Sequence, residues 1–152
     1  MARMRYWKIT PEEAGALEYD REKLVNWEIK CALPDQSSFV GVFLYRRGTP
    51  FDYESVRGVC MYYNNVGKDV AGRVAGMLAE RYGGKRIEKG ERMFLKGSDE
   101  PYGGDEIGSL ASAVESEIGG KAVISLEFEG ATAEELAGCG MPEAKLLPIP
   151  GG

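Results

Sequence analysis

The stretch from Val56 to Gly97 carries the clearest pattern of apolar and polar positions in the chain. Its middle part, VGKDVAGRVAGMLAERYGG, places apolar residues at steps of three and four, the spacing that lines one face of a helix. The flanking runs, VRGVCMYYNN and KRIEKGERMFLKG, are rich in β-branched, aromatic and methionine side chains and are too short to be buried helices. We therefore predict a strand, a helix and further strand structure. The apolar positions of the predicted helix are Val66, Val70, Ala71, Val74, Ala75, Leu78 and Tyr82.

The residues before this stretch predict a first strand, a short helix and a β-hairpin. Thr10, Pro11 and Glu13 have the spacing of a capping box with proline at the first helical position. Residues 25–33 alternate between apolar and polar side chains, which predicts a strand with one buried and one solvated face. After turn-forming residues at 34–38, the run FVGVFLYRR is apolar on both faces, as expected of a central strand. These two strands are predicted to pair.

The residues after Arg86 leave one choice open and then predict a second helix and a last strand. The pair Lys89-Gly90 divides residues 85–97, which form either one strand or two short strands joined by a tight turn. Apolar residues between positions 107 and 118 lie on one face of a helix that a Gly-Gly pair ends. The run KAVISLEFEG then alternates as a half-exposed strand.

The order of these elements predicts an α+β fold. Residues 1–140 are expected to form a single domain with a mostly antiparallel sheet and two main amphipathic helices, and residues 141–152 an extended Pro- and Gly-rich tail. Over residues 56–130 the order strand, helix, two short strands, helix, strand is that of a ferredoxin-like half, which the N-terminal hairpin would extend. Both main helices would then cover one face of the sheet and leave the other face partly open. Many unrelated functions share this order, so it does not indicate an activity.

Composition and charge exclude several classes of function. The chain has 152 residues, 28% of them charged, with a net charge of −5, and its basic residues are scattered, which argues against nucleic-acid binding. No apolar run reaches the length of a membrane span, and the first residues lack the apolar core of a signal peptide, so we expect no membrane partner. The three cysteines, Cys31, Cys60 and Cys139, are far apart and odd in number, which predicts free thiols and a reducing, cytoplasmic setting.

The chain lacks histidine, which removes the usual general base and the usual nitrogen ligand of zinc. No pattern of catalytic residues, metal ligands or cofactor-binding glycines replaces it, so we predict no catalytic residue, no metal and no cofactor. Aromatic and arginine side chains, which are enriched where protein partners bind, are plentiful instead. We therefore expect a non-catalytic accessory or inhibitory factor that recognises another protein, on a surface that would also allow a homo-oligomer. The predicted partner-binding residues are Tyr45, Arg46, Arg47, Phe51, Tyr53 and Tyr63.

The adjacent pair Tyr62-Tyr63 must point to opposite faces of its strand, so at most one of the two rings enters the core beneath the helix. The other ring is then exposed or is covered by something else. Whether the tyrosines of this region fill the core or form a recognition surface is left open at this point, because tyrosine is often half-buried.

The alternative hypothesis is a small enzyme or sensor that binds an anionic, phosphate-bearing metabolite. Asn65, Gly67 and Lys68 lie where a strand meets the N-terminus of a helix, and free backbone N–H groups there favour an anion. The segment lacks the glycine spacing of a P-loop, and an asparagine before a helix is usually a cap. A deep cavity that reaches this helix start would favour the metabolite, whereas a flat aromatic face would favour the protein partner.

Overall fold

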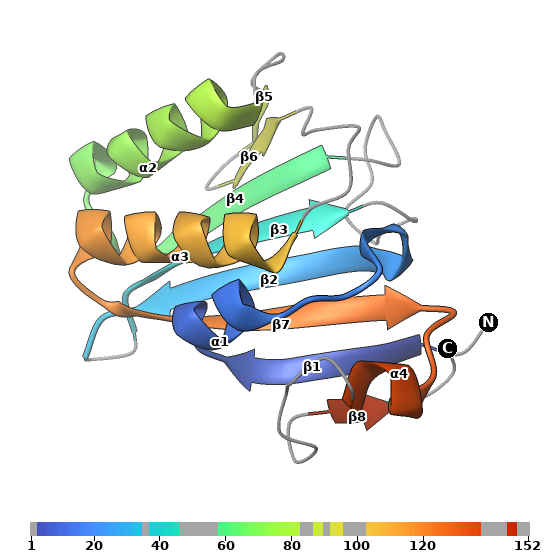
Figure 1. Cartoon of the computed structure of the whole chain (residues 1–152). Helices are drawn as coiled ribbons and strands as arrows, with labels where there is room; N and C mark the ends of the chain where they lie inside the picture. The colour runs from blue at the N-terminus through green and yellow to red at the C-terminus, as the bar shows by residue number, and fades with distance from the viewer. Residues whose placement is uncertain are drawn as a thin grey trace.

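The computed structural model describes residues 3–34, 37–45, 58–82, 87–89, 92–95, 103–137 and 146–148. These residues form one antiparallel sheet with helices, which confirms the α+β class (Figure 1). The strands are β1 (Arg3–Ile9), β2 (Leu24–Ala32), β3 (Phe39–Tyr45), β4 (Gly58–Asn64), β5 (Ile87–Lys89), β6 (Arg92–Leu95), β7 (Lys121–Glu129) and β8 (Leu146–Pro148). The helices are α1 (Pro11–Ala16), a 3-10 turn (Arg21–Lys23), α2 (Lys68–Tyr82), α3 (Gly104–Ile118) and α4 (Ala133–Ala137).

The strands follow the order β5-β6-β4-β3-β2-β7-β1-β8 across the sheet. The predicted hairpin of β2 and β3 is present, with Ile29 opposite Val42. Residues 85–97 had two possible structures, one strand or two short strands. The structure has two short strands, β5 and β6, which pair with Lys89 opposite Arg92. Each neighbouring pair is antiparallel.

The ferredoxin-like half predicted for residues 56–130 is not confirmed by this order. That arrangement needs β4 and β7 side by side, and instead β3 and β2 lie between them. The N-terminal hairpin is therefore inserted in the middle of the sheet and does not extend its edge. The apolar character of β3 on both faces agrees with this central position, because apolar side chains on either face then pack against the strands on both sides of β3.

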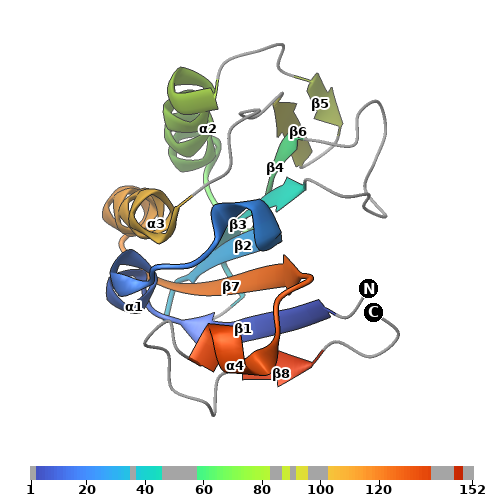
Figure 2. The ribbon, with the colours of Figure 1, turned by 45° about the vertical axis from the view of Figure 1, so that its right-hand side comes forward.

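One face of the sheet carries the hydrophobic core. Figure 2 shows α1, α2 and α3 on the same side of the sheet, where α2 packs over β4 and β6, and α3 packs over β2 and β7. Five positions of the apolar stripe predicted for α2 are buried there: Ala71, Val74, Ala75, Leu78 and Tyr82. From the strands, alternate residues meet the helices; they include Trp27, Ile29, Val42, Leu44, Met61, Ile124, Leu126 and Phe128.

The helix starts follow the local signals in the sequence. The capping box of α1 is present: the Thr10 N–H donates to Glu13 Oε1 at 3.0 Å, and the Glu13 N–H donates to Thr10 Oγ1 at 3.1 Å. Before α4, the Glu135 N–H donates to Thr132 Oγ1 at 3.1 Å. The Glu135 carboxylate also accepts from Lys23 Nζ at 2.7 Å. This second contact ties α4 to the turn that precedes β2.

Part of the predicted tail lies in the sheet. Leu146–Pro148 forms β8, which pairs with β1 at the edge of the sheet, with Leu147 opposite Arg5. An edge strand tolerates proline, since one side of it makes no ladder hydrogen bonds. The domain boundary predicted at residue 140 falls among residues outside those described. No helix among the described residues is both long enough and apolar enough to span a membrane.

Two of the three cysteines are described, and both are buried free thiols. Cys31 and Cys60 expose 0% and 2% of their surface, and burial raises the pKa of the Cys31 thiol to about 11. A neutral, buried thiol reacts slowly with alkylating and disulfide reagents, because the thiolate is the nucleophile. Cys139 lies outside the described residues.

We expect thiol titration to separate these sites. The denatured, unreduced protein should react at all three cysteines, and a native Cys139→Ser variant should react only on the timescale of unfolding. Absorbance after addition of an aromatic disulfide reagent gives both counts. A count of one in the denatured protein would reveal a disulfide and overturn the prediction of a reducing setting.

Candidate interaction surface

The sheet face that lies opposite the helices is the candidate site, and we call it the open face. Alternation along β2, β3, β4 and β7 sends every second side chain to this face, and no helix among the described residues covers it (Figure 2). Val123 lies on it with 39% of its surface exposed, and it is the large apolar side chain that the described residues leave most open. An antiparallel sheet can leave one face to solvent, but such a face is then normally polar.

The register across the four strands arranges the open face in rows. Each row has one residue from β7, β2, β3 and β4, in that order. The first row is Lys121, Ala32, Phe39 and Asn64; the second is Val123, Lys30, Gly41 and Tyr62; the third is Ser125, Glu28, Phe43 and Cys60; and the fourth is Glu127, Asn26, Tyr45 and Gly58.

Three rings, Phe39, Phe43 and Tyr62, gather on the β3–β4 half of the open face, and we call them the aromatic cluster. The Tyr62 ring lies across Gly41, where a Cβ atom would overlap it. Its centroid is 5.8 Å from that of Phe39, edge to face at 71°, and 5.8 Å from that of Phe43 at 31°. All three rings are half-buried. Beneath them Cys60 is almost fully buried, so the cluster forms a second apolar layer outside the main core.

Charged groups border the aromatic cluster. The Tyr62 hydroxyl donates to Glu28 Oε2 at 3.4 Å, and Lys30 Nζ lies 4.6 Å from the Phe39 ring centroid. Burial, together with the Glu28 charge, raises the pKa of the Tyr62 hydroxyl, which therefore keeps its proton and remains a donor. The Glu28 carboxylate therefore borders the cluster beside Tyr62, and the Lys30 ammonium group lies over the Phe39 ring.

The four strands carry charges of both signs on the open face. The first and second rows carry the cations Lys121 and Lys30, and the third and fourth rows carry the anions Glu28 and Glu127. On the neighbouring strand β1, Arg5 lies opposite Glu127, so a cation adjoins the fourth row as well. Charges of both signs around an apolar cluster can help to select a partner.

The predicted partner-binding residues do not all lie on the open face, and most of them lie outside the described residues. Tyr63 packs against the main core on the helix-covered face, so the outward ring of the pair is Tyr62. Tyr45 ends β3 within the fourth row, and its side chain is not described. The remaining four predicted residues, Arg46, Arg47, Phe51 and Tyr53, lie outside the described residues.

Sequence reasoning did not identify Phe39 and Phe43 as site residues. The signal was present in the run FVGVFLYRR, where apolar residues occupy both faces of one strand. If one face of such a strand meets the helices, the alternate residues must cover the opposite face. Choosing between the two faces required knowing which side the helices pack on.

Two of the three anion-binding residues of the alternative hypothesis, Asn65 and Gly67, make hydrogen bonds within the protein. Asn65 adopts a left-handed conformation with φ of 53°, and its Nδ2 donates to Ser38 Oγ at 3.1 Å. Gly67 accepts the Ala71 N–H at 3.0 Å, which is the first hydrogen bond of α2. Lys68 is exposed, and the acidic Asp69 follows it in the first turn of the helix. None of these contacts tests anion binding, which stays a prediction.

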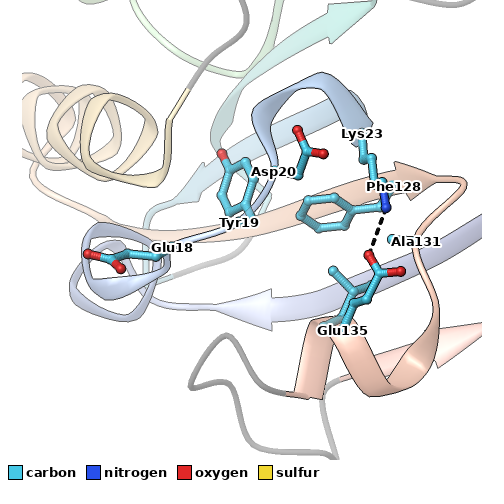
Figure 3. Close-up of a pocket in the computed structure, with 8 residues that line it drawn as sticks. Glu18, Tyr19, Asp20, Lys23, Phe128, Ala131 and Glu135 are labelled. Carbon is cyan, nitrogen blue, oxygen red and sulfur yellow. Dashed lines mark hydrogen bonds and ion pairs between the residues drawn. The ribbon is translucent and has the colours of Figure 1, made fainter.

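Two cavities lined by described residues lie elsewhere, on the helix-covered side. Their volumes are about 340 and 330 Å³, and both are lined by Glu18 and Tyr19. Figure 3 shows the first, where Tyr19 meets Phe128 edge to face at 5.1 Å and Lys23 reaches across to Glu135. The residues that line them do not include the start of α2. Among the described residues, no group of three or more acidic or cysteine side chains could hold a metal ion.

Comparisons of the chain with models of known protein families, with curated proteins and with solved structures find no match. The function is therefore argued from the geometry of the open face.

Proposed function

We propose that this protein is a non-catalytic accessory or inhibitory factor that binds another protein through its open face. The observation that carries the proposal is the aromatic cluster, three half-buried rings on a sheet face that no described helix covers. Rings are the side chains that most often supply binding energy at protein interfaces, and here they stand between groups of opposite charge. A reducing, cytoplasmic setting is part of the proposal, which the free thiols of Cys31 and Cys60 support.

The sheet also holds these rings in place before any partner arrives. Tyr62 is supported by Gly41 beneath it, by Phe39 and Phe43 on either side and by its hydrogen bond to Glu28. Side chains that are already ordered lose little conformational entropy on binding, so more of the contact energy remains as affinity. The cavity beside Tyr19 offers less to a ligand, because Lys23 and Glu135 on its rim already pair with each other.

We expect Phe43→Ala to weaken partner binding by about ten- to thirtyfold, the typical cost of truncating an interface ring. Stability should fall less, because the ring is half-buried and its neighbour Tyr62 stays in place. The partner would be captured from a native lysate, identified by mass spectrometry, purified and titrated by calorimetry against both proteins. Urea midpoints measured beside the affinities separate binding from folding.

Tyr63→Ala is the matched control, because its ring lies in the same strand as Tyr62 but on the helix-covered face. It should lower the urea midpoint and leave the affinity of the folded fraction unchanged. The proposal is wrong if Phe43→Ala keeps full affinity, or if Tyr63→Ala weakens binding more than Phe43→Ala does. The predicted residues Phe51 and Tyr53 can be tested in the same way.

A further inference from the structure

We propose that Gly41 is a positioning residue of the open face, because the absence of a side chain at this position determines where the Tyr62 ring lies. Gly41 is directly opposite Tyr62 in the register of β3 and β4. A Cβ atom at Gly41 would overlap three atoms at the far end of the Tyr62 side chain, Cε1, Cζ and the hydroxyl oxygen. The inference rests on the proposed function, since it gives Gly41 a part in binding, but the position of the ring can be tested without any partner.

Glycine is an unfavourable residue for the middle of a central strand. It loses more conformational entropy on folding than any other residue, and it contributes no side chain to packing. A glycine inside a strand often marks a β-bulge, but β3 pairs with β2 and with β4 through Gly41 without a shift in register. The other common reason for such a glycine is the close approach of another group. At Gly41 that group is the Tyr62 ring.

The Tyr62 ring fills the gap that Gly41 leaves between two phenylalanines. Phe39, Gly41 and Phe43 alternate along β3, so all three face the open side, with about 7 Å between successive Cα atoms of the set. The centroid of the Tyr62 ring is 5.8 Å from that of each phenylalanine ring. The Tyr62 hydroxyl reaches past β3 and donates to Glu28 Oε2, on β2, at 3.4 Å. The aromatic cluster is therefore continuous along β3, although its middle ring belongs to β4.

A methyl group at position 41 should move the Tyr62 ring and leave the backbone in place. The overlapping atoms lie at the end of a side chain that can change its rotamer, so no strand has to shift. Once it has turned away from β3, the ring loses its contacts with Phe39 and Phe43 and its hydrogen bond to Glu28. Alanine suits the middle of a strand better than glycine, which offsets part of the lost packing. Gly41→Ala should therefore change the binding surface more than the urea midpoint.

The first part of the test follows the Tyr62 ring by NMR of the full chain with isotope-labelled tyrosine rings, and Tyr62→Phe identifies the signal by removing it. In the unaltered chain, ring currents from the two phenylalanines should displace the Tyr62 signal. The pKa of its hydroxyl should lie above the ordinary value, because of burial and the Glu28 charge. In Gly41→Ala the signal and the pKa should both move toward those of an exposed tyrosine. Gly72→Ala, where the methyl meets nothing within 4 Å, should change neither.

The second part measures affinity by calorimetry, with the partner protein captured and purified for the Phe43→Ala experiment. Gly41→Ala should weaken binding about tenfold, and Tyr62→Ala should weaken it at least as much. Because Gly41 acts through the ring, adding Gly41→Ala to Tyr62→Ala should cause no further loss of affinity. This non-additivity distinguishes a positioning role from a direct clash between the new methyl group and the partner. Urea midpoints of the same variants show how much of each effect is due to folding.

Three outcomes would overturn the inference: an unchanged Tyr62 signal and pKa in Gly41→Ala, additive losses of affinity in the double variant, or full affinity in Gly41→Ala beside weakened binding in Phe43→Ala. If Gly41→Ala does not fold, Tyr62→Ala in the same chain should restore folding, because the methyl group then overlaps no ring. A double variant that stays unfolded would also overturn the inference. A ring that moves as expected, in a protein that retains no partner or whose partner ignores Phe43→Ala, would refute the proposed function and keep the position that Gly41 sets.

Discussion

Trp27→Ala is expected to lower the free energy of unfolding by about 3–5 kcal/mol, the range for removing a buried aromatic ring. Among the residues whose burial is described, Trp27 is the largest fully buried side chain, and it lies on β2, in the middle of the sheet. Its neighbours in register are Leu44 on β3 and Leu126 on β7, both buried, so the ring is held from two strands beneath the helices. Alanine would leave a cavity at this position. β2 cannot move to fill it without shifting its pairing with β3 and β7, which also carry the open face.

Urea unfolding followed by far-ultraviolet circular dichroism measures this change, and Trp27→Phe is the graded control. Phenylalanine leaves a smaller cavity, so its cost should fall between zero and the cost of alanine. A loss of unfolding free energy below about 1 kcal/mol for Trp27→Ala would contradict this packing. Such a small loss is expected only for a side chain outside a close-packed core. A variant that is unfolded without urea would agree with it, because the expected loss approaches the whole stability of many domains.

Gly108→Ala is expected to destabilise the protein by about 1–3 kcal/mol, the usual cost of overpacking. A Cβ atom at Gly108 of α3 would lie 2.6 Å from the Pro11 carbonyl oxygen and 3.0 Å from the Gly15 nitrogen of α1. Both are backbone atoms, so no side-chain rotation relieves the clash, and the two helices must separate. A Cβ atom at Gly104, one turn earlier, would overlap the Ala14 carbonyl oxygen in the same way.

Gly72→Ala provides the matched control and should change stability in the opposite direction. A Cβ atom at Gly72 or at Gly76 of α2 meets nothing within 4 Å, so alanine there adds only its better helix propensity. That gain is about 0.5–1 kcal/mol for a glycine in the middle of a helix. Equal effects at Gly108 and Gly72 in thermal or urea unfolding would show that α1 and α3 do not approach as closely as described.

The two faces of the sheet are expected to contribute differently to stability and to binding. The helix-covered face contains the main core, where Trp27 and Leu126 pack, and its loss unfolds the protein. The open face carries a thinner apolar layer, in which Phe43 and Tyr62 remain half-exposed. Changes to that layer are therefore expected to alter binding more than folding. This separation is what allows the binding experiments to be interpreted without a large correction for stability.

Local features could be predicted from the sequence because they depend on residues close together in the chain. The capping box of Thr10 and Glu13, the apolar stripe of α2 and the alternation of β7 are set by spacing and by backbone geometry within a few residues. The pairing of β2 with β3 was also predictable, since a short turn joins them. The α+β class follows from the order of such elements.

The position of the hairpin and the composition of the open face were decided only by the tertiary structure. Which strands become neighbours depends on burial gained between segments far apart in the chain, and β3, apolar on both faces, gains most at the centre. The sequence by itself determined that Tyr62 and Tyr63 point to opposite faces. Only the packing of α2 over β4 decided that Tyr63 turns to the core and that Tyr62 joins Phe39 and Phe43 outside it, because the helix can cover just one face of the strand.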